Sequence, residues 1–175
     1  CFTFRTTSAN FRFASSTSAG ADTRMADPCA LGVAALTAAY AAAEADPVST
    51  TEAYLARIAR EDGRLHSFIT VATDPALAAA EDSRRRWRDG RTLGALDGVP
   101  IALKDNIEVA GLACTAGTAA FRGRVPQADA AVVSRLKKQG AVLLGKLNMH
   151  EGALGATTDN PVYGRCMNPL KFGYT

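Results

Sequence analysis

The sequence predicts an α/β fold in which amino-terminal helices pack on the first strands of a mixed sheet. Residues 25–92 are dominated by helical patterns that begin at prolines or at capping side chains. Two short apolar runs follow at residues 99–103 and 141–144, and a further helical pattern separates them. A strand, a helix and a second strand in this order are typical of a βαβ unit, whose two strands run parallel.

The first two helices are predicted from aspartate–proline pairs and a capping motif. The pair at residues 27–28 predicts a helix that reaches Ala42, and a second pair at residues 46–47 ends it. Residues 49–52 read Ser-Thr-Thr-Glu and fit a capping box. Ser49 is therefore expected to cap a second helix.

An extended segment and a third helix are expected next. Residues 65–72 form a candidate short strand or extended segment. An aspartate–proline pair at residues 74–75 opens a helix that reaches Trp87 and is closed by Gly90.

The crossover helix is expected to begin after a cap at Asp129 and to end at Gly140. Three of its apolar residues are expected to face the core: Val132, Val133 and Leu136. This orientation turns Ser134 and Lys137 outward. Their S-x-x-K spacing, known from serine–lysine hydrolases, is therefore interpreted as a surface pair.

The chain is expected to contain one domain after an amino-terminal segment. Residues 1–24 are rich in Ser, Thr, Arg and Phe, and no acidic residue precedes Asp22. We assign residues 1–24 to a disordered tail or to an upstream or targeting segment, with Met25 as the candidate native start. Residues 25–175 form the domain, helical over 25–92 and the start of an α/β core over 93–175.

Composition excludes several classes of function. The net charge is +3 and no long Lys/Arg block occurs, so no nucleic-acid partner is expected. No apolar run reaches the roughly 18 residues of a membrane span. The four cysteines lie far apart and only two histidines are present, so no zinc spacing exists. Free thiols favour a cytoplasmic location, with organellar targeting by residues 1–24 as the alternative.

Other short motifs fail on closer inspection. Residues 140–146 match G-x-x-x-x-G-K, but Leu147 follows where a phosphate loop supplies Ser or Thr, and the intervening residues read as a strand. His150-Glu151 starts a zinc-protease pattern that has Leu154 at its last position. An encounter of Cys114 with His150 stays open, although a buried structural cysteine is favoured.

Lys104 is the residue that the apolar strand pattern at residues 99–103 does not explain. It ends the apolar run at residues 99–103 and is followed at once by Asp105 and Asn106. A run of this kind fits a strand buried on both faces, where a lysine is costly. Lys104 therefore either reaches water and pairs with Asp105, or supplies an amine for chemistry at the carboxyl end of a strand.

At this point the chain resembles the amidase signature hydrolases. The resemblance covers residues 93–175, with weaker helical similarity from Met25. Its matching blocks are residues 94–106, 111–118, 129–133, 140–149 and 160–169. The fold that this implies is the amino-terminal portion of an amidase signature domain, incomplete in residues 25–175.

The resemblance implies a Ser–cis-Ser–Lys triad in which Lys104 is the base. In that family the lysine relays a proton through a bridging serine to a nucleophilic serine, and desolvation makes an amine a usable base. Asp105 and Asn106 are expected to be positioning residues. The family's Gly/Ser-rich stretch with both serines does not occur in residues 1–175, so this chain is expected to lack its nucleophile and to be inactive alone.

The implied function is hydrolysis of a carboxylic amide to an acid and ammonia or an amine through an acyl-serine. No metal or organic cofactor is implied, and the partner is a small-molecule amide, with a homodimer as an open alternative. Residues 150–152 (His-Glu-Gly) favour a free amidase over the A subunit of an aminoacyl-tRNA amidotransferase, which is the one alternative in which a nucleic-acid partner is expected. A truncated, non-catalytic scaffold is the other alternative. Lys137 and Lys146 are expected to be dispensable for the chemical step.

Overall fold

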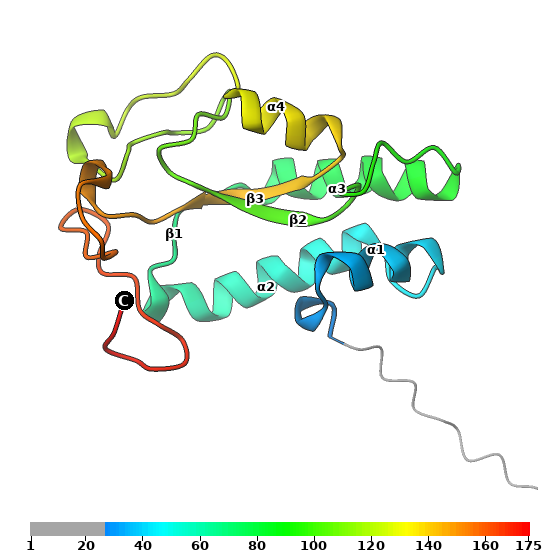
Figure 1. Cartoon of the computed structure of the whole chain (residues 1–175), viewed down its shortest axis with the longest axis horizontal. Coiled ribbons are helices and arrows are strands. Elements are labelled where there is room, and N and C mark those ends of the chain that lie inside the picture. The colour runs from blue at the N-terminus through cyan, green and yellow to red at the C-terminus, as the bar shows by residue number, and fades with distance from the viewer. Residues whose placement is uncertain (1–26) are drawn as a thin grey trace, which may run out of the picture.

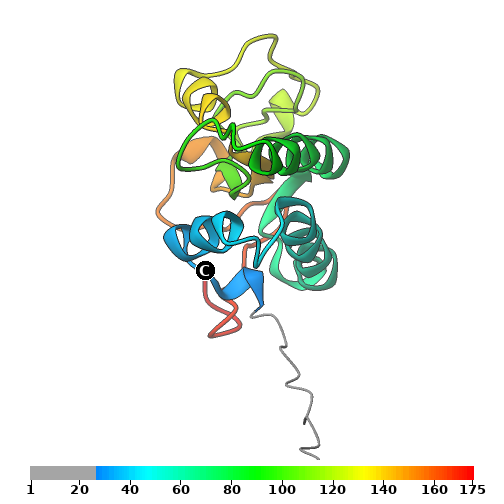
Figure 2. The same ribbon diagram turned by 90° about the vertical axis from the view of Figure 1, so that its right-hand side faces the viewer.

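The computed structural model describes residues 27–175, so the assignments made for residues 1–24 and for Met25 lie outside the described residues. The chain forms an α/β structure in which a small sheet lies between helices (Figure 1). Helix α4 lies on one side of the sheet, and helices α1 and α2 lie on the other, as a second view also shows (Figure 2). The predicted fold class is therefore confirmed.

The amino-terminal helices begin at different residues than the sequence suggested. A 3₁₀ turn at Pro28–Ala30 and helix α1 at Val33–Ala41 replace the single predicted helix, because the backbone of Leu31 is extended between them. Helix α2 spans Pro47–Leu65 and is capped by Asp46, whose carboxylate accepts hydrogen bonds from the Val48 and Ser49 amides. The predicted Ser49 cap is therefore wrong, because Asp46 and a proline at the first helical position start this helix earlier.

Strand β1 spans Phe68–Val71 and helix α3 spans Thr73–Arg88, close to the predicted segments. Strand β2 spans Pro100–Lys104, helix α4 spans Ala131–Lys138 and strand β3 spans Val142–Leu147.

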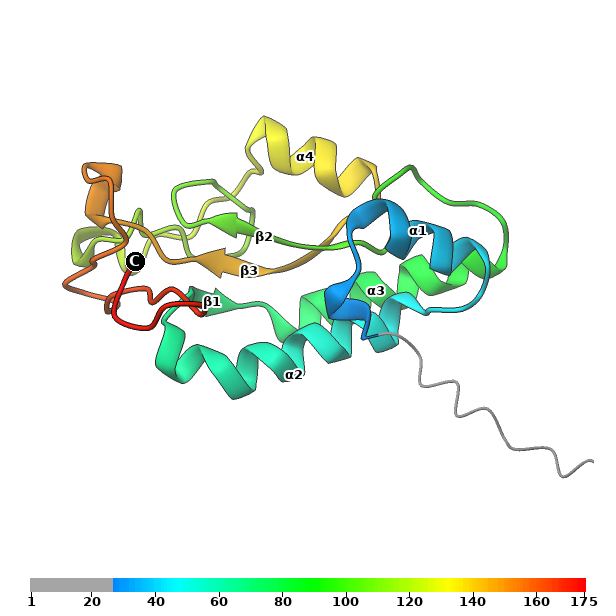
Figure 3. The same ribbon diagram turned by 60° about the horizontal axis from the view of Figure 1, so that its bottom comes forward.

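The sheet has the order β1-β3-β2. Strand β3 pairs parallel with β2 and antiparallel with β1, so the sheet is mixed and the βαβ unit is confirmed. Figure 3 shows β3 between its two neighbours. Among the strands of residues 27–175, β3 alone is buried along most of its length, whereas Ile101 and Ala102 of the edge strand β2 are half-buried. The expectation that both strands are buried on both faces therefore holds for β3 alone.

The crossover helix differs from its prediction in two respects. Asp129 does not cap α4; its carboxylate accepts hydrogen bonds from the Ala110 amide and from Lys137 Nζ, and Ala130 occupies the cap position. Val133 is buried as expected, but Val132 is 47% exposed. An eight-residue helix lying over one face of a sheet buries a narrow stripe, and Val132 falls outside it.

Two apolar clusters lie on opposite faces of the sheet. One joins α3 to β3 through buried residues: Ala76, Ala80, Val142 and Leu144. The other joins β2, the following loop and α4 through Leu103, Val109 and Val133. These clusters fix β2 and β3 relative to each other, and the carboxyl ends of both strands meet at one edge of the sheet.

Candidate active site

Lys104 ends strand β2 at the edge where functional sites of α/β sheets usually form. In the parallel pairing Leu103 lies opposite Lys146, and Lys104 lies opposite Leu147. Because successive side chains of a strand point to opposite faces, Leu103 enters the cluster under α4 while Lys104 points to the other face. The side chain of Lys104 is exposed at this strand end.

Within residues 27–175, Lys104 forms no ion pair with a carboxylate. Asp105 forms an ion pair, but with Lys146. Asp105 Oδ1 lies 3.2 Å from Lys146 Nζ, and both side chains are fully buried. The alternative in which Lys104 reaches water and pairs with Asp105 is thus right about exposure and wrong about the pairing. The pairing fails because Asp105 points to the face opposite Lys104, where Lys146 lies.

Asp105 is the centre of a buried hydrogen-bond network. Its Oδ2 accepts hydrogen bonds from the Thr115 amide at 2.8 Å and from the Thr115 hydroxyl at 2.5 Å. Its backbone carbonyl accepts one from Cys114 Sγ at 3.0 Å. The backbone amide of Asp105 donates to the Leu147 carbonyl at 3.1 Å. Both the backbone and the side chain of Asp105 are therefore fixed.

Lys146 is the functional candidate that sequence reasoning missed. Its ammonium donates to Asp105 Oδ1 at 3.2 Å, to the Asp105 carbonyl at 3.3 Å and to the Ala113 carbonyl at 3.3 Å. These three acceptors engage all three donors of an ammonium, which has no lone pair with which to accept a proton. One signal was available: a lysine within an apolar strand needs a buried partner, and Asp105 follows the parallel neighbour.

Asn106 is not part of this network. The Lys104 carbonyl accepts a hydrogen bond from the Ile107 amide at 2.9 Å, which places Asn106 in a tight turn. Its side chain is exposed and forms no hydrogen bond with the described residues. Lys104, Asp105 and Asn106 are therefore neighbours in the chain, but only Asp105 is tied to the surrounding structure through its side chain.

The side-chain amide of Asn160 fixes the loop beside this hydrogen-bond network. Asn160 is 2% exposed, and its Nδ2 donates to the Gly117 carbonyl at 2.8 Å and to the Met149 carbonyl at 2.7 Å. Its Oδ1 accepts hydrogen bonds from the Val162 and Tyr163 amides. Because all its polar atoms are satisfied, Asn160 holds the segment that includes Thr115 against the segment that follows β3.

The remaining candidates have structural roles. Lys137 pairs with Asp129 at 2.8 Å on the surface, as expected for a residue turned outward. Cys114 is buried, and His150 Nδ1 lies 3.3 Å from the Thr157 hydroxyl. Among residues 27–175 no group of three or more metal-ligating side chains occurs, and no helix in that range is long and apolar enough to cross a membrane.

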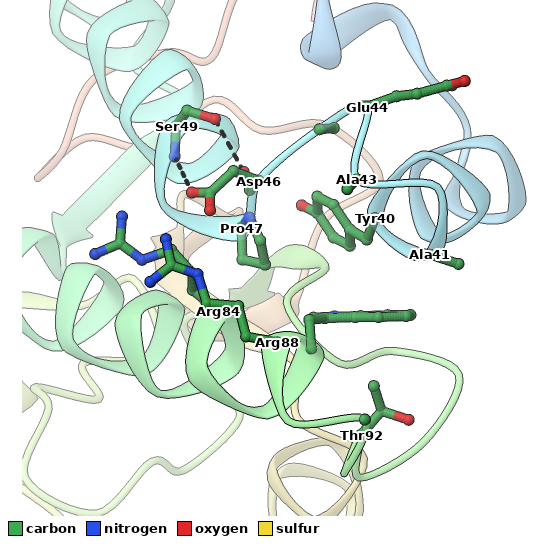
Figure 4. Close-up of a pocket in the computed structure, with 13 residues that line it drawn as sticks. Tyr40, Ala41, Ala43, Glu44, Asp46, Pro47, Ser49, Arg84, Arg88 and Thr92 are labelled. Carbon is green, nitrogen blue, oxygen red and sulfur yellow. Dashed lines mark hydrogen bonds between the residues drawn. The ribbon is translucent and has the colours of Figure 1, made fainter.

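A cavity of about 710 Å³ lies away from Lys104, between the end of α1, the start of α2 and α3 (Figure 4). Tyr40, Arg84 and Arg88 line it. Burial raises the pKa of Tyr40 to about 12, and its hydroxyl donates to the Gly98 carbonyl at 3.1 Å. This tyrosine therefore holds the turn before β2.

Comparisons with known proteins show which proteins the chain is similar to. A family model described as Amidase matches residues 49–175. The A subunit of the glutamyl-tRNA(Gln) amidotransferase of Anaeromyxobacter dehalogenans is 43% identical over 147 residues, which are 84% of this chain and 30% of that protein. The Chloroflexus aurantiacus protein of the same name is 45% identical over 139 residues, 79% of this chain and 28% of that protein.

Solved structures are similar in fold as well as in sequence. The native peptide amidase from Stenotrophomonas maltophilia is 40% identical with a TM-score of 0.75, and the match covers 82% of this chain and 31% of that chain. The chain thus spans about 30% of the length of the curated relatives that it matches.

Proposed function

Because the chain belongs to the amidase signature family, we propose that residues 25–175 are the amino-terminal part of an amidase domain. The proposed enzyme hydrolyses the C–N bond of a small carboxylic amide, releasing an acid and ammonia or an amine. The nucleophilic serine and the bridging serine are supplied by sequence beyond Thr175, in keeping with the roughly 30% of each relative that this chain spans.

The observation that carries this proposal is the position of Lys104. It is an exposed amine at the carboxyl end of a parallel strand, and the next residue is anchored in the protein interior. In the proposed reaction Lys104 accepts a proton from the bridging serine, which takes the proton of the nucleophilic serine. The serine oxygen attacks the amide carbon, the C–N bond breaks, and the leaving nitrogen receives the proton through the same relay.

Water completes the cycle. It attacks the acyl-serine ester, its proton returns through the relay to regenerate the serine hydroxyl, and the acid leaves. No metal or organic cofactor has a part in this scheme. Lys146 is not available for this relay, because its side chain is fully buried and its three donors are engaged with Asp105 and Ala113.

The proposed location is the cytoplasm, and it rests on the cysteines. Cys29, Cys114 and Cys166 are free thiols, which is in keeping with a reducing cytoplasm. The proposed partner is a small-molecule amide, and a homodimer remains compatible with this scheme.

A second candidate is the A subunit of a glutamyl-tRNA(Gln) amidotransferase. The observation in its favour is the 43–45% identity to proteins of that name. In that role the same lysine and serines would release ammonia from an amide donor for use by a partner. The His-Glu-Gly sequence at residues 150–152 favours the free amidase.

One experiment separates the two. The full-length protein, purified alone, is given N-acetylphenylalaninamide, benzamide and glutamine, and ammonia release is measured. We expect turnover of at least one of the first two amides, with covalent labelling of one serine by a fluorophosphonate. Turnover of glutamine only, stimulated by co-purified partner proteins and charged tRNA, would favour the amidotransferase. Release from none of the amides under either condition would refute both.

A further inference from the structure

We propose that Lys146, Asp105 and Thr115 form a positioning network that holds Lys104 in its catalytic geometry. The inference rests on the proposed amidase function and goes beyond it, because it gives a role to three side chains that are buried in the protein. It starts from an unusual feature: a lysine and an aspartate that are both fully buried in one small domain.

A buried ion pair needs an explanation other than stability. Removing two charges from water costs about as much as their mutual attraction returns, so apolar residues at these positions could stabilise the fold equally well. The pair is nevertheless complete: Lys146 has three acceptors, and the Asp105 carboxylate accepts from Lys146 and twice from Thr115. A fully satisfied polar network of this kind specifies one geometry.

The network joins three segments of the chain, of which β3 is distant from the other two in the sequence. Asp105 follows β2, Lys146 lies in β3, and Ala113 and Thr115 belong to the loop between β2 and α4. Cys114 adds a hydrogen bond from its thiol to the Asp105 carbonyl. Lys104 is the residue immediately before the point where these segments meet.

The contacts fix the backbone on both sides of Lys104. On the strand side, Leu103 pairs with Lys146 and is buried under α4. On the other side, the Asp105 amide donates to the Leu147 carbonyl and its carboxylate is held by Lys146 and Thr115. The long Lys104 side chain is free at its tip, so the direction of its first bond depends on these anchors. A displacement of about 1 Å at a catalytic group can cost on the order of 10²-fold in rate.

This assignment changes the expectation for Lys146. The sequence suggested that Lys137 and Lys146 are equally dispensable for the chemical step. Lys137 forms an ion pair at the surface, whereas Lys146 is buried against the residue that follows Lys104. Of these two lysines, Lys137 alone is still expected to have no influence on catalysis.

The first test uses a matched pair of variants at Thr115 in the full-length enzyme. Thr115→Val keeps the shape of the side chain and removes the hydroxyl that donates to Asp105 Oδ2, whereas Thr115→Ser keeps it. With active sites counted by fluorophosphonate labelling, we expect Thr115→Val to lower kcat about tenfold with KM nearly unchanged, and Thr115→Ser to stay within about threefold of wild type.

The second test separates positioning from stability. The double variant Asp105→Asn/Lys146→Met removes both charges together, so no uncompensated charge is buried and the protein is expected to fold. We expect kcat to fall about 10²-fold, and backbone amide hydrogen exchange over residues 104–107 to accelerate. Lys137→Met, which breaks a surface pair, serves as the control and should change neither quantity.

The outcomes are distinguishable. If wild type is active and Lys104→Ala is inactive, but the folded double variant and Thr115→Val keep native kcat and native exchange, the network is merely structural and the positioning proposal is wrong. If wild type hydrolyses no amide, the proposed function itself fails. If wild type is active and Lys104→Ala keeps native turnover, the assignment of Lys104 as the base fails, and the positioning role fails in either case.

Discussion

At the scale of single residues, buried carboxylates organise both ends of β2. Asp105 does so after the strand, and Asp97 does so before it: the Asp97 carboxylate accepts hydrogen bonds from Arg86 Nη2 at 2.6 Å, Arg86 Nε at 2.9 Å and the Leu93 amide at 2.8 Å. Burial alone would raise the pKa of Asp97, but the hydrogen bonds from Arg86 and Leu93 outweigh burial and place the pKa below its usual value of 3.8.

A pH dependence follows from this pKa shift. A carboxyl whose pKa is lower in the folded state stabilises the fold above its ordinary value of 3.8, and this contribution is lost as the pH falls through the folded-state pKa. We expect Asp97→Asn to lower the free energy of unfolding by about 2 kcal/mol at pH 7 and by less at pH 3. Urea titrations at both pH values measure this difference.

The matched control is Asp89→Asn, which breaks an exposed pair with Arg91 and should change stability by less than about 0.5 kcal/mol. Equal losses for Asp97→Asn at both pH values would show that the charge of Asp97 is unimportant.

Lys104 and Lys146 differ in how far their surroundings could be predicted from the sequence. The exposed position of Lys104 could be predicted, because an apolar run that ends in a lysine predicts a strand end. A lysine within an apolar strand signals that a buried partner exists, but the identity of that partner could not be predicted. The pairing of Lys146 with Asp105, 41 positions away, depends on the register between β2 and β3. Periodicity describes one segment at a time and carries no register.

At the scale of elements, the strands and most helices were predictable, and the exact helix starts were not. Asp46 and Ser49 both have side chains that can cap a helix. The proline at position 47 decides between them, because it fixes the first helical residue. The sheet likewise contains a feature that the predictions did not include: the register of β3 against β2 shifts between Leu143 and Gly145.

Gly145 permits the close approach of β1 to β3. A Cβ atom at this position would lie 2.1 Å from the Thr70 carbonyl oxygen, a backbone atom that cannot rotate away. Gly145→Ala is therefore expected to lower the free energy of unfolding by about 3 kcal/mol, as overpacking does. Chemical denaturation of the full-length protein measures the effect.

Gly63→Ala is the control, since nothing lies within 4 Å of a Cβ there and alanine favours helix α2 by up to about 1 kcal/mol. A Gly145→Ala protein as stable as wild type would mean that β1 does not approach β3 this closely.

At the scale of the whole molecule, the described residues form a three-stranded sheet with β1 and β2 at its edges. Several large apolar side chains near the carboxyl end are exposed, among them Leu154, Leu170 and Phe172. Unpaired strand edges and exposed apolar groups favour self-association. In the amidase that we propose, further sequence would cover these surfaces and supply the serines.

Chain length is therefore expected to control both behaviour in solution and activity. The 175-residue chain, expressed alone, should elute as heterogeneous oligomers and release no ammonia from amides, because in the amidase that we propose both serines are supplied by further sequence, and Lys104 without them has no nucleophile to activate. A longer chain that includes the proposed Gly/Ser-rich segment and the rest of the sheet should be monodisperse and active. A monodisperse 175-residue chain that hydrolyses amides would overturn this expectation and redirect attention to Cys114 and Ser134.

The most direct measurement compares two lysine variants of the full-length enzyme. Ammonia release per labelled serine is measured for Lys104→Ala and Lys137→Ala, with circular dichroism to confirm that both proteins are folded. Loss of the base should lower kcat of Lys104→Ala by at least about 10²–10⁴-fold, while Lys137→Ala stays near wild type. Turnover of Lys104→Ala within about threefold of wild type would contradict the assignment of Lys104 as the base.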